Sequence, residues 1–252
     1  MAIKGKKVVA TIEGRMTSTR LPGKIMMPLA GKPVMAHMIE RHRRSKYTDE
    51  VIVATTKLST DDPVVELCKQ IHCPYFRGSE EDVLGRIVEA GREHEADILV
   101  QGMADSPLVD WRIVDQLIEM LAKGAYDCTS NEFQEAYPDG FDMRVYSFPV
   151  LSRYEQENTG LEHREHAGYF LRNDPKRYKR GLLKAEGDMR WPELRLTLDT
   201  AEDYRLIAAV YDELYPKNPD FSAADVVAFL KDRPDLVAIN STIKQKVPTV
   251  SS

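Results

Sequence analysis

The chain is poor in cysteine, which excludes a disulfide-stabilised extracellular domain. Its 252 residues include three cysteines, Cys68, Cys73 and Cys128, too few and odd in number for a disulfide framework, so we expect reduced thiols. Cys68 and Cys73 flank His72, but two thiols and one imidazole at that spacing form a poor zinc set. We therefore expect these cysteines to pack as small hydrophobic residues.

The chain also lacks long apolar runs and a large excess of either charge. Hydrophobic residues make up 42% and charged residues 30% of the sequence, with a net charge of −5, which indicates neither disorder nor a transmembrane span. An acidic balance weighs against broad nucleic-acid binding, which needs a basic face. The N-terminus has no apolar signal-peptide region. We expect a soluble, cytoplasmic protein with no membrane or nucleic-acid partner.

Short apolar runs alternate with helical patterns through the first half of the chain. The strand patterns lie at residues 8–12, 51–55, 74–76 and 97–101, and the helical patterns begin at Pro33, Asp62, Val83 and Asp110. This alternation predicts an α/β fold with a mostly parallel sheet and helices on both faces. The length suits one domain, which we expect to span residues 1–240.

The pattern changes after residue 125. Residues 126–131 and 141–148 are strand-like and flank a turn, so they can pair antiparallel. Further expected elements are helices at 150–156 and 162–172, strands at 178–184 and 195–199, and helices from Thr200 and Ser222. We interpret residues 126–185 as a β-rich insertion. The apolar pattern fades beyond Asn240, so we expect a disordered tail at 241–252.

Residues 11–24 form a loop at the carboxyl end of the first strand, where open α/β sheets bind ligands. Gly14 and Gly23 let the backbone turn tightly and approach a ligand, while Arg15, Arg20 and Lys24 suit phosphate oxygens. The loop lacks the three glycines of the dinucleotide fingerprint, and its lysine is not followed by the Ser or Thr of a Walker loop. We interpret it as a polyphosphate-binding loop of another kind.

Asp105 follows the strand pattern at 97–101 and lies beside a proline turn. A carboxylate at the carboxyl end of a central strand is well placed to bind a hard cation. The sequence therefore predicts a cation site close to the loop at 11–24.

Five motifs in this order resemble those of the cytidylyltransferase family, over roughly residues 7–215. They are Arg15-Met-Thr-Ser-Thr-Arg-Leu-Pro-Gly-Lys24, Arg77-Gly-Ser-Glu-Glu-Asp-Val-Leu84, Asp105-Ser-Pro-Leu-Val-Asp110, Pro138-Asp-Gly-Phe-Asp142 and Leu198-Asp-Thr-Ala-Glu-Asp203. The chain is most similar to the spore-coat-polysaccharide branch, which is related to synthetases of CMP-activated acidic sugars. The resemblance implies a Rossmann-like nucleotidyltransferase fold. It also implies an enzyme that transfers CMP from CTP to an acceptor, with Mg²⁺, and releases pyrophosphate.

The resemblance also implies roles for residues that would bind the nucleotide and the metal. Arg15 and Lys24 would hold the triphosphate, assisted by Arg20, and the backbone at Gly14, beside Glu13, would approach the nucleotide. Asp105 and Asp199 would bind Mg²⁺, with Asp203 as the rival of Asp199. Arg15, Lys24 and Asp105 are the expected catalytic residues. The residues expected nearer the base are Ser79, Arg86 and Gln101.

The expected acceptor-binding residues are Asp139, Asp142, Arg164, Glu165 and His166. The last three resemble an Arg-Glu-His motif of the family, and the guanidinium of Arg164 suits an acceptor carboxylate or phosphate. Because relatives often pair through the insertion, a homodimer formed through 126–185 is expected.

The chain departs from the family pattern at three places. Glu13-Gly14 stands where relatives usually have Gln-Ala, Ala104 replaces the usual glycine before Asp105, and Arg144 stands where an acidic residue is common. Glu13 adds negative charge near the triphosphate, and Arg144 adds positive charge near the acceptor. We therefore hypothesise that the acceptor carries a phosphate or phosphonate, as an alternative to an acidic sugar.

Two other functions remain open from the sequence. A glycosyltransferase of similar sheet topology would use a nucleotide sugar and release no pyrophosphate. A non-catalytic nucleotide-binding paralogue would lack cations or carboxylates of the site, and the chain retains Arg15, Lys24, Asp105 and Asp199.

Overall fold

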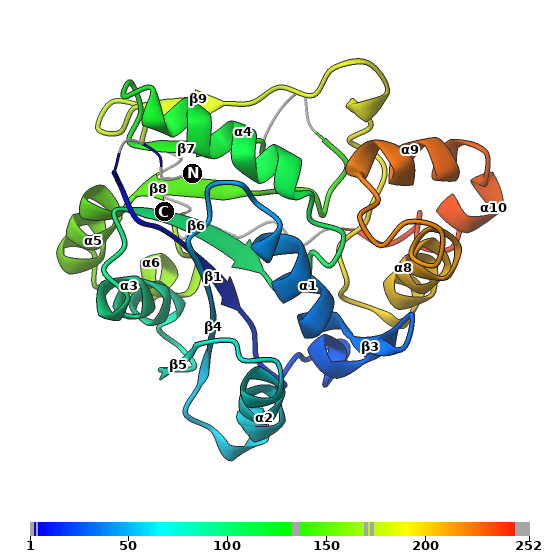
Figure 1. Ribbon diagram of the computed structural model, residues 1–252, viewed down its shortest axis with the longest axis horizontal. Helices are drawn as coiled ribbons and strands as arrows, with labels where there is room; N and C mark the ends of the chain where they lie inside the picture. Colours follow the sequence, from blue (N-terminus) through cyan, green and yellow to red (C-terminus); the bar gives the residue numbers. More distant parts are fainter. Residues whose placement is uncertain (1–2, 4, 133–136, 169–170, 172–173, 245–252) are drawn as a thin grey trace.

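The centre of the molecule is a seven-stranded sheet, built from the residues that the computed structural model describes, namely 3, 5–132, 137–168, 171 and 174–244 (Figure 1). The strands lie in the order β5-β4-β1-β6-β8-β7-β9. Their bounds are β1 Val8–Glu13, β4 Glu50–Thr56, β5 Tyr75–Gly78, β6 Ile98–Met103, β7 Cys128–Ser130, β8 Arg144–Ser147 and β9 Arg180–Leu182. β5, β4, β1 and β6 are parallel, β8 is antiparallel to β6 and β7, and β9 is parallel to β7.

Helices cover both faces of the sheet, as predicted. The helices that connect the parallel strands are α1 Val34–Arg43, α2 Asp62–Gln70, α3 Val83–Glu93 and α4 Trp111–Ala122. Along β1, Val8, Ala10 and Ile12 join one core cluster while Val9 joins another. Since side chains of a strand alternate between faces, the two clusters lie on opposite sides of the sheet. The near-continuous apolar runs are therefore explained by burial on both faces.

The second half of the chain extends the same sheet. β7, β8 and β9 lie within the expected insertion and continue the sheet beyond β6, and the expected antiparallel pairing of the segment at 141–148 is confirmed for β8. Between β8 and β9 lie α5 Phe148–Glu157 and α6 Leu161–Glu165. Of the expected helix at 162–172, the first part is helical, as α6, whereas residues 166–168 form a bend and a turn, and residues 169–170 and 172–173 lie outside the described part.

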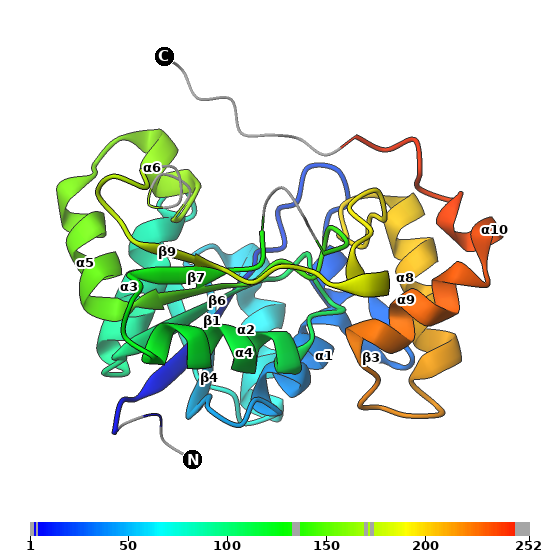
Figure 2. The same ribbon diagram turned by 90° about the horizontal axis from the view of Figure 1, so that it is seen from above.

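The C-terminal helices pack beside the carboxyl-end edge of the sheet (Figure 2). They are α8 Ala201–Leu214, α9 Ala223–Lys231 and α10 Pro234–Val237. Thr200 with Asp203 and Ser222 with Asp225 form capping boxes that start α8 and α9. The remaining short elements are η1 Lys24–Met26, β2 Pro28–Leu29, β3 Lys32–Pro33, η2 Ser59–Asp61 and η3 Gly187–Met189.

The expected strand at 195–199 is wrong, because this segment makes a single isolated bridge, between Asp139 and Arg195. Its backbone is extended, but Leu196 N–H donates to the carbonyl of Asp139 at 2.6 Å and Leu198 N–H donates to that of Asp105 at 2.7 Å. The two acceptors belong to different loops, so no ladder forms. The segment instead joins the loop after β6 to the turn before β8.

The remaining expectations about the whole chain have mixed outcomes. The three cysteines are free and buried, as predicted. Every helix in the described part is too short or too polar to cross a bilayer. The single domain and the homodimer formed through 126–185 stay predictions, and residues 245–252 of the expected tail lie outside the described part.

The turn at Gly140 makes a close backbone contact that should not tolerate a side chain. Gly140 has φ of 108°, and a Cβ there would lie 2.5 Å from the carbonyl carbon of Leu196. We expect Gly140→Ala to lower the melting temperature by about 10 °C, because backbone atoms cannot move aside cheaply. Gly124 is the matched control, since it has φ of 87° but no atom of the described part of the chain lies within 4 Å of a built Cβ. Calorimetric melting that shows equal losses for both alanine variants would contradict this account.

Candidate active site

A cavity of about 330 Å³ opens at the carboxyl ends of β1 and β6. It forms where residues 14–25 and 103–105 leave the sheet, which is the edge where parallel α/β sheets bind ligands. Nine of the residues predicted from the sequence line it: Glu13, Gly14, Arg15, Arg20, Lys24, Arg86, Asp105, Glu165 and His166. The structure thus brings cations and carboxylates from four distant segments to one cavity.

The loop after β1 is held in place by Asp61. One oxygen of this fully buried carboxylate accepts from Met16 N–H at 2.8 Å, and the other accepts from the hydroxyls of Thr55 and Thr56 and from Thr56 N–H. Gly23, with φ of 72°, then turns the chain into η1. Asp61 therefore anchors the cationic loop to β4.

Arg15 lies at the open side of the cavity. Its guanidinium pairs with Glu80 at 3.2 Å, and its side chain is 42% exposed. Thr17 donates to the same glutamate at 2.7 Å. Because an exposed ion pair of this kind contributes little free energy, Arg15 can leave Glu80 for a phosphate group.

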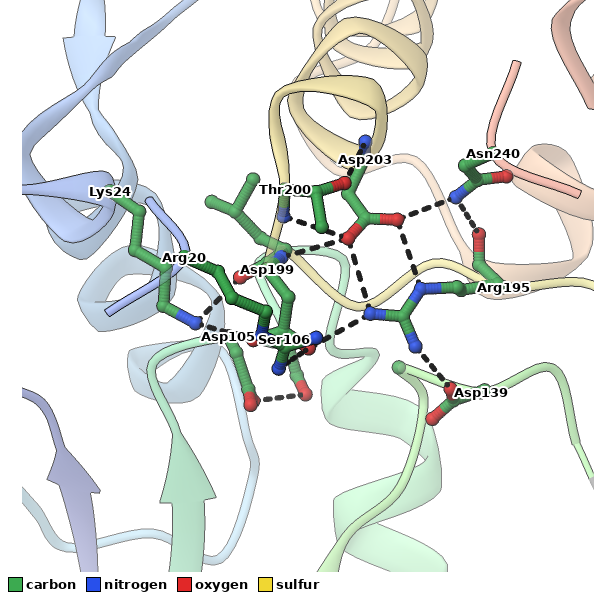
Figure 3. A network of polar contacts seen from close by, with 12 residues as sticks. Arg20, Lys24, Asp105, Ser106, Asp139, Arg195, Asp199, Thr200, Asp203 and Asn240 are labelled. Atoms are coloured by element: carbon green, nitrogen blue, oxygen red, sulfur yellow. Dashed lines mark hydrogen bonds and ion pairs between the residues drawn. The ribbon is translucent and has the colours of Figure 1, made fainter. Parts of the chain in front are cut away.

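Asp199 is the point where the cations of the site converge (Figure 3). Its Oδ1 is 2.9 Å from Lys24 Nζ, and its Oδ2 is 3.0 Å from Arg20 and 2.9 Å from Arg195. Burial alone would raise the pKa of Asp199, but the charges of Lys24, Arg20 and Arg195 outweigh it and hold the pKa below the usual value. Asp199 is therefore a carboxylate kept ionised in a buried position.

Sequence reasoning missed Arg195, which organises this region. The guanidinium is buried and contacts Asp139 at 3.3 Å, Asp199 at 2.9 Å and Asp203 at 3.0 Å. The alternation along residues 195–199 points to Arg195. Leu196 and Leu198 belong to the core, so the side chains of Arg195, Thr197 and Asp199 face the opposite side of the segment.

The carboxylate of Asp203 is fully engaged in hydrogen bonds with neighbouring groups. Its two oxygens accept from Arg195, from Asn240 and from the backbone N–H groups of Asp199 and Thr200, and the side chain is fully buried. These contacts give Asp203 a structural role at the start of α8, and they favour Asp199 as the carboxylate that can reach a ligand.

Asp105 lines the cavity, whereas Asp199 lies next to it and does not itself line the cavity. Leu198 N–H donates to the Asp105 carbonyl, which places Asp199 beside it, and the Asp105 carboxylate contacts the Ser106 hydroxyl at 3.2 Å. Among the described residues there is no group of three or more His, Cys, Asp or Glu side chains arranged to hold a metal. Two carboxylates nevertheless fit Mg²⁺, which keeps several waters and takes further ligands from substrate phosphates.

Glu13 and Arg86 lie on the other wall of the cavity. Glu13 accepts from Gln101 at 3.1 Å through Oε1, while its buried Oε2 has no hydrogen-bond partner among the described residues. Burial raises the pKa of Glu13, although the charges of Arg86 and Arg144 oppose this effect. Arg86 is 4% exposed and donates to the Ser79 carbonyl. Gln101 lies beneath Glu13 and does not line the cavity.

The expected acceptor residues fall into two groups. Glu165 and His166 line the cavity. Arg164 does not line it and instead pairs with Glu155 at 2.6 Å and Asp82 at 3.2 Å, which ties α6 to the start of α3. Ser79 does not line the cavity either, and its hydroxyl accepts from Asp82 N–H.

Asp139 and Asp142 do not line the cavity. Asp139 contacts Arg195, and Gly140 N–H donates to Asp142 at 3.2 Å. Burial, together with the charge of Asp139, raises the pKa of Asp142 to about 7. Burial also raises the pKa of Asp139, against the opposing charge of Arg195. Arg144 is compensated as well, since it pairs with Glu132.

The sequence as a whole matches the family model described as Cytidylyltransferase over residues 9–224. The chain belongs to the cytidylyltransferase family. Members of this family are nucleotidyltransferases, so the resemblance and the enzyme class predicted from the motifs are confirmed.

Three relatives of this cytidylyltransferase illustrate the match. It is 32% identical over 235 residues to the spore coat polysaccharide biosynthesis protein SpsF of Bacillus subtilis (strain 168), over 90% of this chain and 95% of that protein. A cytidylyltransferase structure from Leptospira borgpetersenii has a TM-score of 0.87 at 30% identity, covering 95% of this chain and 100% of that one. A CMP:2-keto-3-deoxy-manno-octonic acid synthetase complexed with CTP has a TM-score of 0.61 at 20% identity, covering 82% and 99%, which shows the fold alone.

Two departures of this cytidylyltransferase from the family pattern are in direct contact. A Cβ built on Gly14 would lie 2.9 Å from the Cβ of Ala104 and 2.8 Å from the terminal methyl of Met35. The space between the segments that follow β1 and β6 therefore accepts a single methyl group, which Ala104 supplies.

This contact predicts non-additive effects of substitution. We expect Gly14→Ala to lower the melting temperature by about 5 °C, because it puts two methyl groups where one fits. The double variant Gly14→Ala with Ala104→Gly should recover most of this loss, and Ala104→Gly alone should cost little. A thermal double-mutant cycle measures the coupling, and strictly additive effects would refute the contact.

The pKa of Asp142 predicts a pH-dependent stability. Its folded value of about 7 lies above the ordinary value of 3.8, so the folded protein retains a proton that the unfolded chain releases. The stabilisation that this group provides is complete below about pH 4 and is lost as the pH rises through 7.

Asn at position 142 mimics the protonated carboxyl at all pH values. We expect Asp142→Asn to raise the melting temperature at pH 8 by on the order of 5 °C relative to the unmodified protein, with little difference at pH 4. Melting curves across this range test the assignment, and an equal difference at both ends would rule it out.

Proposed function

We propose that the protein is a CTP-dependent cytidylyltransferase that joins CMP to an acidic sugar in surface-polysaccharide or related biosynthesis. In this reaction an acceptor hydroxyl oxygen forms a bond to the α-phosphorus, the bond from that phosphorus to the β-phosphate breaks, pyrophosphate leaves and the hydroxyl proton is released. The observation that carries the proposal is the cavity in which Arg15, Arg20 and Lys24 face Asp105, with Asp199 beside them. Such transfer depends on positioning and on charge stabilisation, and it needs no covalent nucleophile.

The cations divide the task of holding the triphosphate. Lys24 is 11% exposed and Arg20 is 34% exposed, so both lie deeper than Arg15, whose side chain is 42% exposed. We assign Lys24 and Arg20 to the phosphates nearest the reacting centre and Arg15 to the outer end. Pairs formed in the partly buried interior are less screened by solvent and fix the chain of phosphates more firmly.

Asp105 and Asp199 would hold Mg²⁺. The bound ion would neutralise charge on the phosphate oxygens as the reaction proceeds. Asp105 would hold it from the loop after β6, and Asp199 from the extended segment before α8. Arg195 keeps Asp199 oriented, and Asp61 keeps the cationic loop over the same cavity.

The acceptor would approach past Glu165 and His166, which line the cavity together with Asp105. A phosphate-bearing acceptor has less support than the sequence suggests, because Arg144 is paired with Glu132 and Arg164 with Asp82 and Glu155. An acidic sugar is therefore our first choice, and phosphate- and phosphonate-bearing acceptors become arms of the test. Asp139 and Asp142 would affect acceptor binding indirectly, by stabilising the turn to which they belong.

The rival functions have less support. A nucleotide-sugar glycosyltransferase does not fit a chain that matches the cytidylyltransferase model over residues 9–224. A non-catalytic paralogue does not fit a cavity that retains the predicted cations and carboxylates.

The direct test is pyrophosphate release from CTP, UTP, ATP and GTP with Mg²⁺, measured against acidic sugars, sugar phosphates and phosphonates. We expect release with CTP and one class of acidic sugar, and loss of release when Mg²⁺ is chelated. No release with any pair, together with transfer from a nucleotide sugar, would reject the proposal.

A second test uses the variant Asp105→Asn, which keeps the size of the side chain and removes its charge. We expect turnover to fall by about 10³-fold or more while the melting temperature stays within a few degrees, since the ligand for the metal is lost but the fold is not. Retained turnover would remove Asp105 from the metal site.

A further inference from the structure

The cations assigned to the triphosphate are already occupied by a carboxylate. Lys24 Nζ lies 2.9 Å from Asp199 Oδ1, and Arg20 lies 3.0 Å from Asp199 Oδ2. The side chains of Asp199 and Lys24 are 8% and 11% exposed, so solvent screens this contact poorly. Asp199 thus pairs with these two cations in the way that a phosphate group of the nucleotide would.

A triphosphate without a metal would have to displace Asp199 from both cations. The displaced carboxylate would remain beside the incoming negative charge, with Arg195 as its remaining partner among these three cations. Leaving a buried charge with fewer partners is strongly unfavourable. A divalent cation removes the penalty, because it can take the place of Lys24 and Arg20 at Asp199 while those cations move to the phosphates.

We propose that Asp199 determines which form of the nucleotide binds, by holding Lys24 and Arg20 until a divalent cation replaces them, so that the metal complex is selected over the free triphosphate. The inference rests on the proposed function of the site and adds a specificity role to a residue assigned there to the metal.

Arg195 is the positioning residue in this exchange. It contacts Asp199 Oδ2 at 2.9 Å and is itself anchored by Asp203 and Asp139, which belong to the start of α8 and to the turn before β8 (Figure 3). These anchors do not involve Lys24 or Arg20. Asp199 therefore keeps its position when the two cations leave, and it presents Oδ1, the oxygen that Lys24 had occupied.

The test compares Asp199→Asn with Asp105→Asn. Both variants remove one carboxylate charge beside the same cavity, but only Asp199 contacts Lys24 and Arg20. Titration calorimetry measures the affinity for CTP and for inorganic triphosphate, in EDTA and in Mg²⁺, without acceptor. Inorganic triphosphate makes the test independent of the choice of base.

For the unmodified protein we expect affinity at least tenfold higher with Mg²⁺ than in EDTA. Asp199→Asn should bind the metal-free probes about tenfold more tightly than the unmodified protein does, and its affinity should depend little on Mg²⁺. Asp105→Asn should lose the gain from Mg²⁺ but show a much smaller increase in EDTA.

Equal increases for the two variants in EDTA would reduce the effect to general electrostatics and overturn the proposal, as would weaker metal-free binding by Asp199→Asn. If the unmodified protein binds neither probe under any condition, the proposed function itself fails. If it binds CTP with Mg²⁺ but the two variants show the same affinities for the metal-free probes, only the proposed role of Asp199 fails. Asp199→Ser, judged by the same comparison, serves if the asparagine variant does not melt cooperatively.

Discussion

A single buried guanidinium holds the ligand-binding end of the molecule together. Arg195 contacts three carboxylates that come from the turn before β8, from its own segment and from α8. Without a cation at this point, Asp139, Asp199 and Asp203 would repel one another in a region with little solvent. Burial of one charge is tolerable here because every donor direction meets an acid, which is the condition under which buried ionic groups persist.

The other arginine and lysine side chains of the site differ in whether they line the cavity. The structure pairs Arg144 with Glu132, Arg164 with Glu155 and Asp82, and Arg15 with Glu80. Arg144, Glu132, Arg164 and Glu155 are largely buried, and their ion pairs connect separate segments of the chain. Arg15, Arg20 and Lys24 differ because they line the cavity themselves, so a ligand with phosphate groups can replace their carboxylate partners.

How far the sequence predicts the site depends on how local each feature is. The loop at 11–24 and Asp105 could be located because the carboxyl ends of parallel strands must share one edge of the sheet, whatever the details of packing. For Arg195 the apolar alternation of its segment indicates the side that it faces, but it does not identify Asp139, 56 positions away in the sequence, as a partner. The alternation along 195–199 wrongly predicts a strand, because it reports which side chains are buried and not which partners the backbone finds. The chemistry of Arg164 suits an acceptor, while its actual partners depend on how α6 packs against α3.

The contact between residues 14 and 104 also limits the order in which this sequence could have changed. If the common pattern of the family, alanine at 14 and glycine at 104, was the starting point, the present pair required two replacements. A chain with alanine at both positions would carry the clash described for a built Cβ on Gly14, whereas a chain with glycine at both would carry only a small void. From that starting point the tolerated route leads through two glycines, so this contact would couple changes in two motifs that lie 90 residues apart.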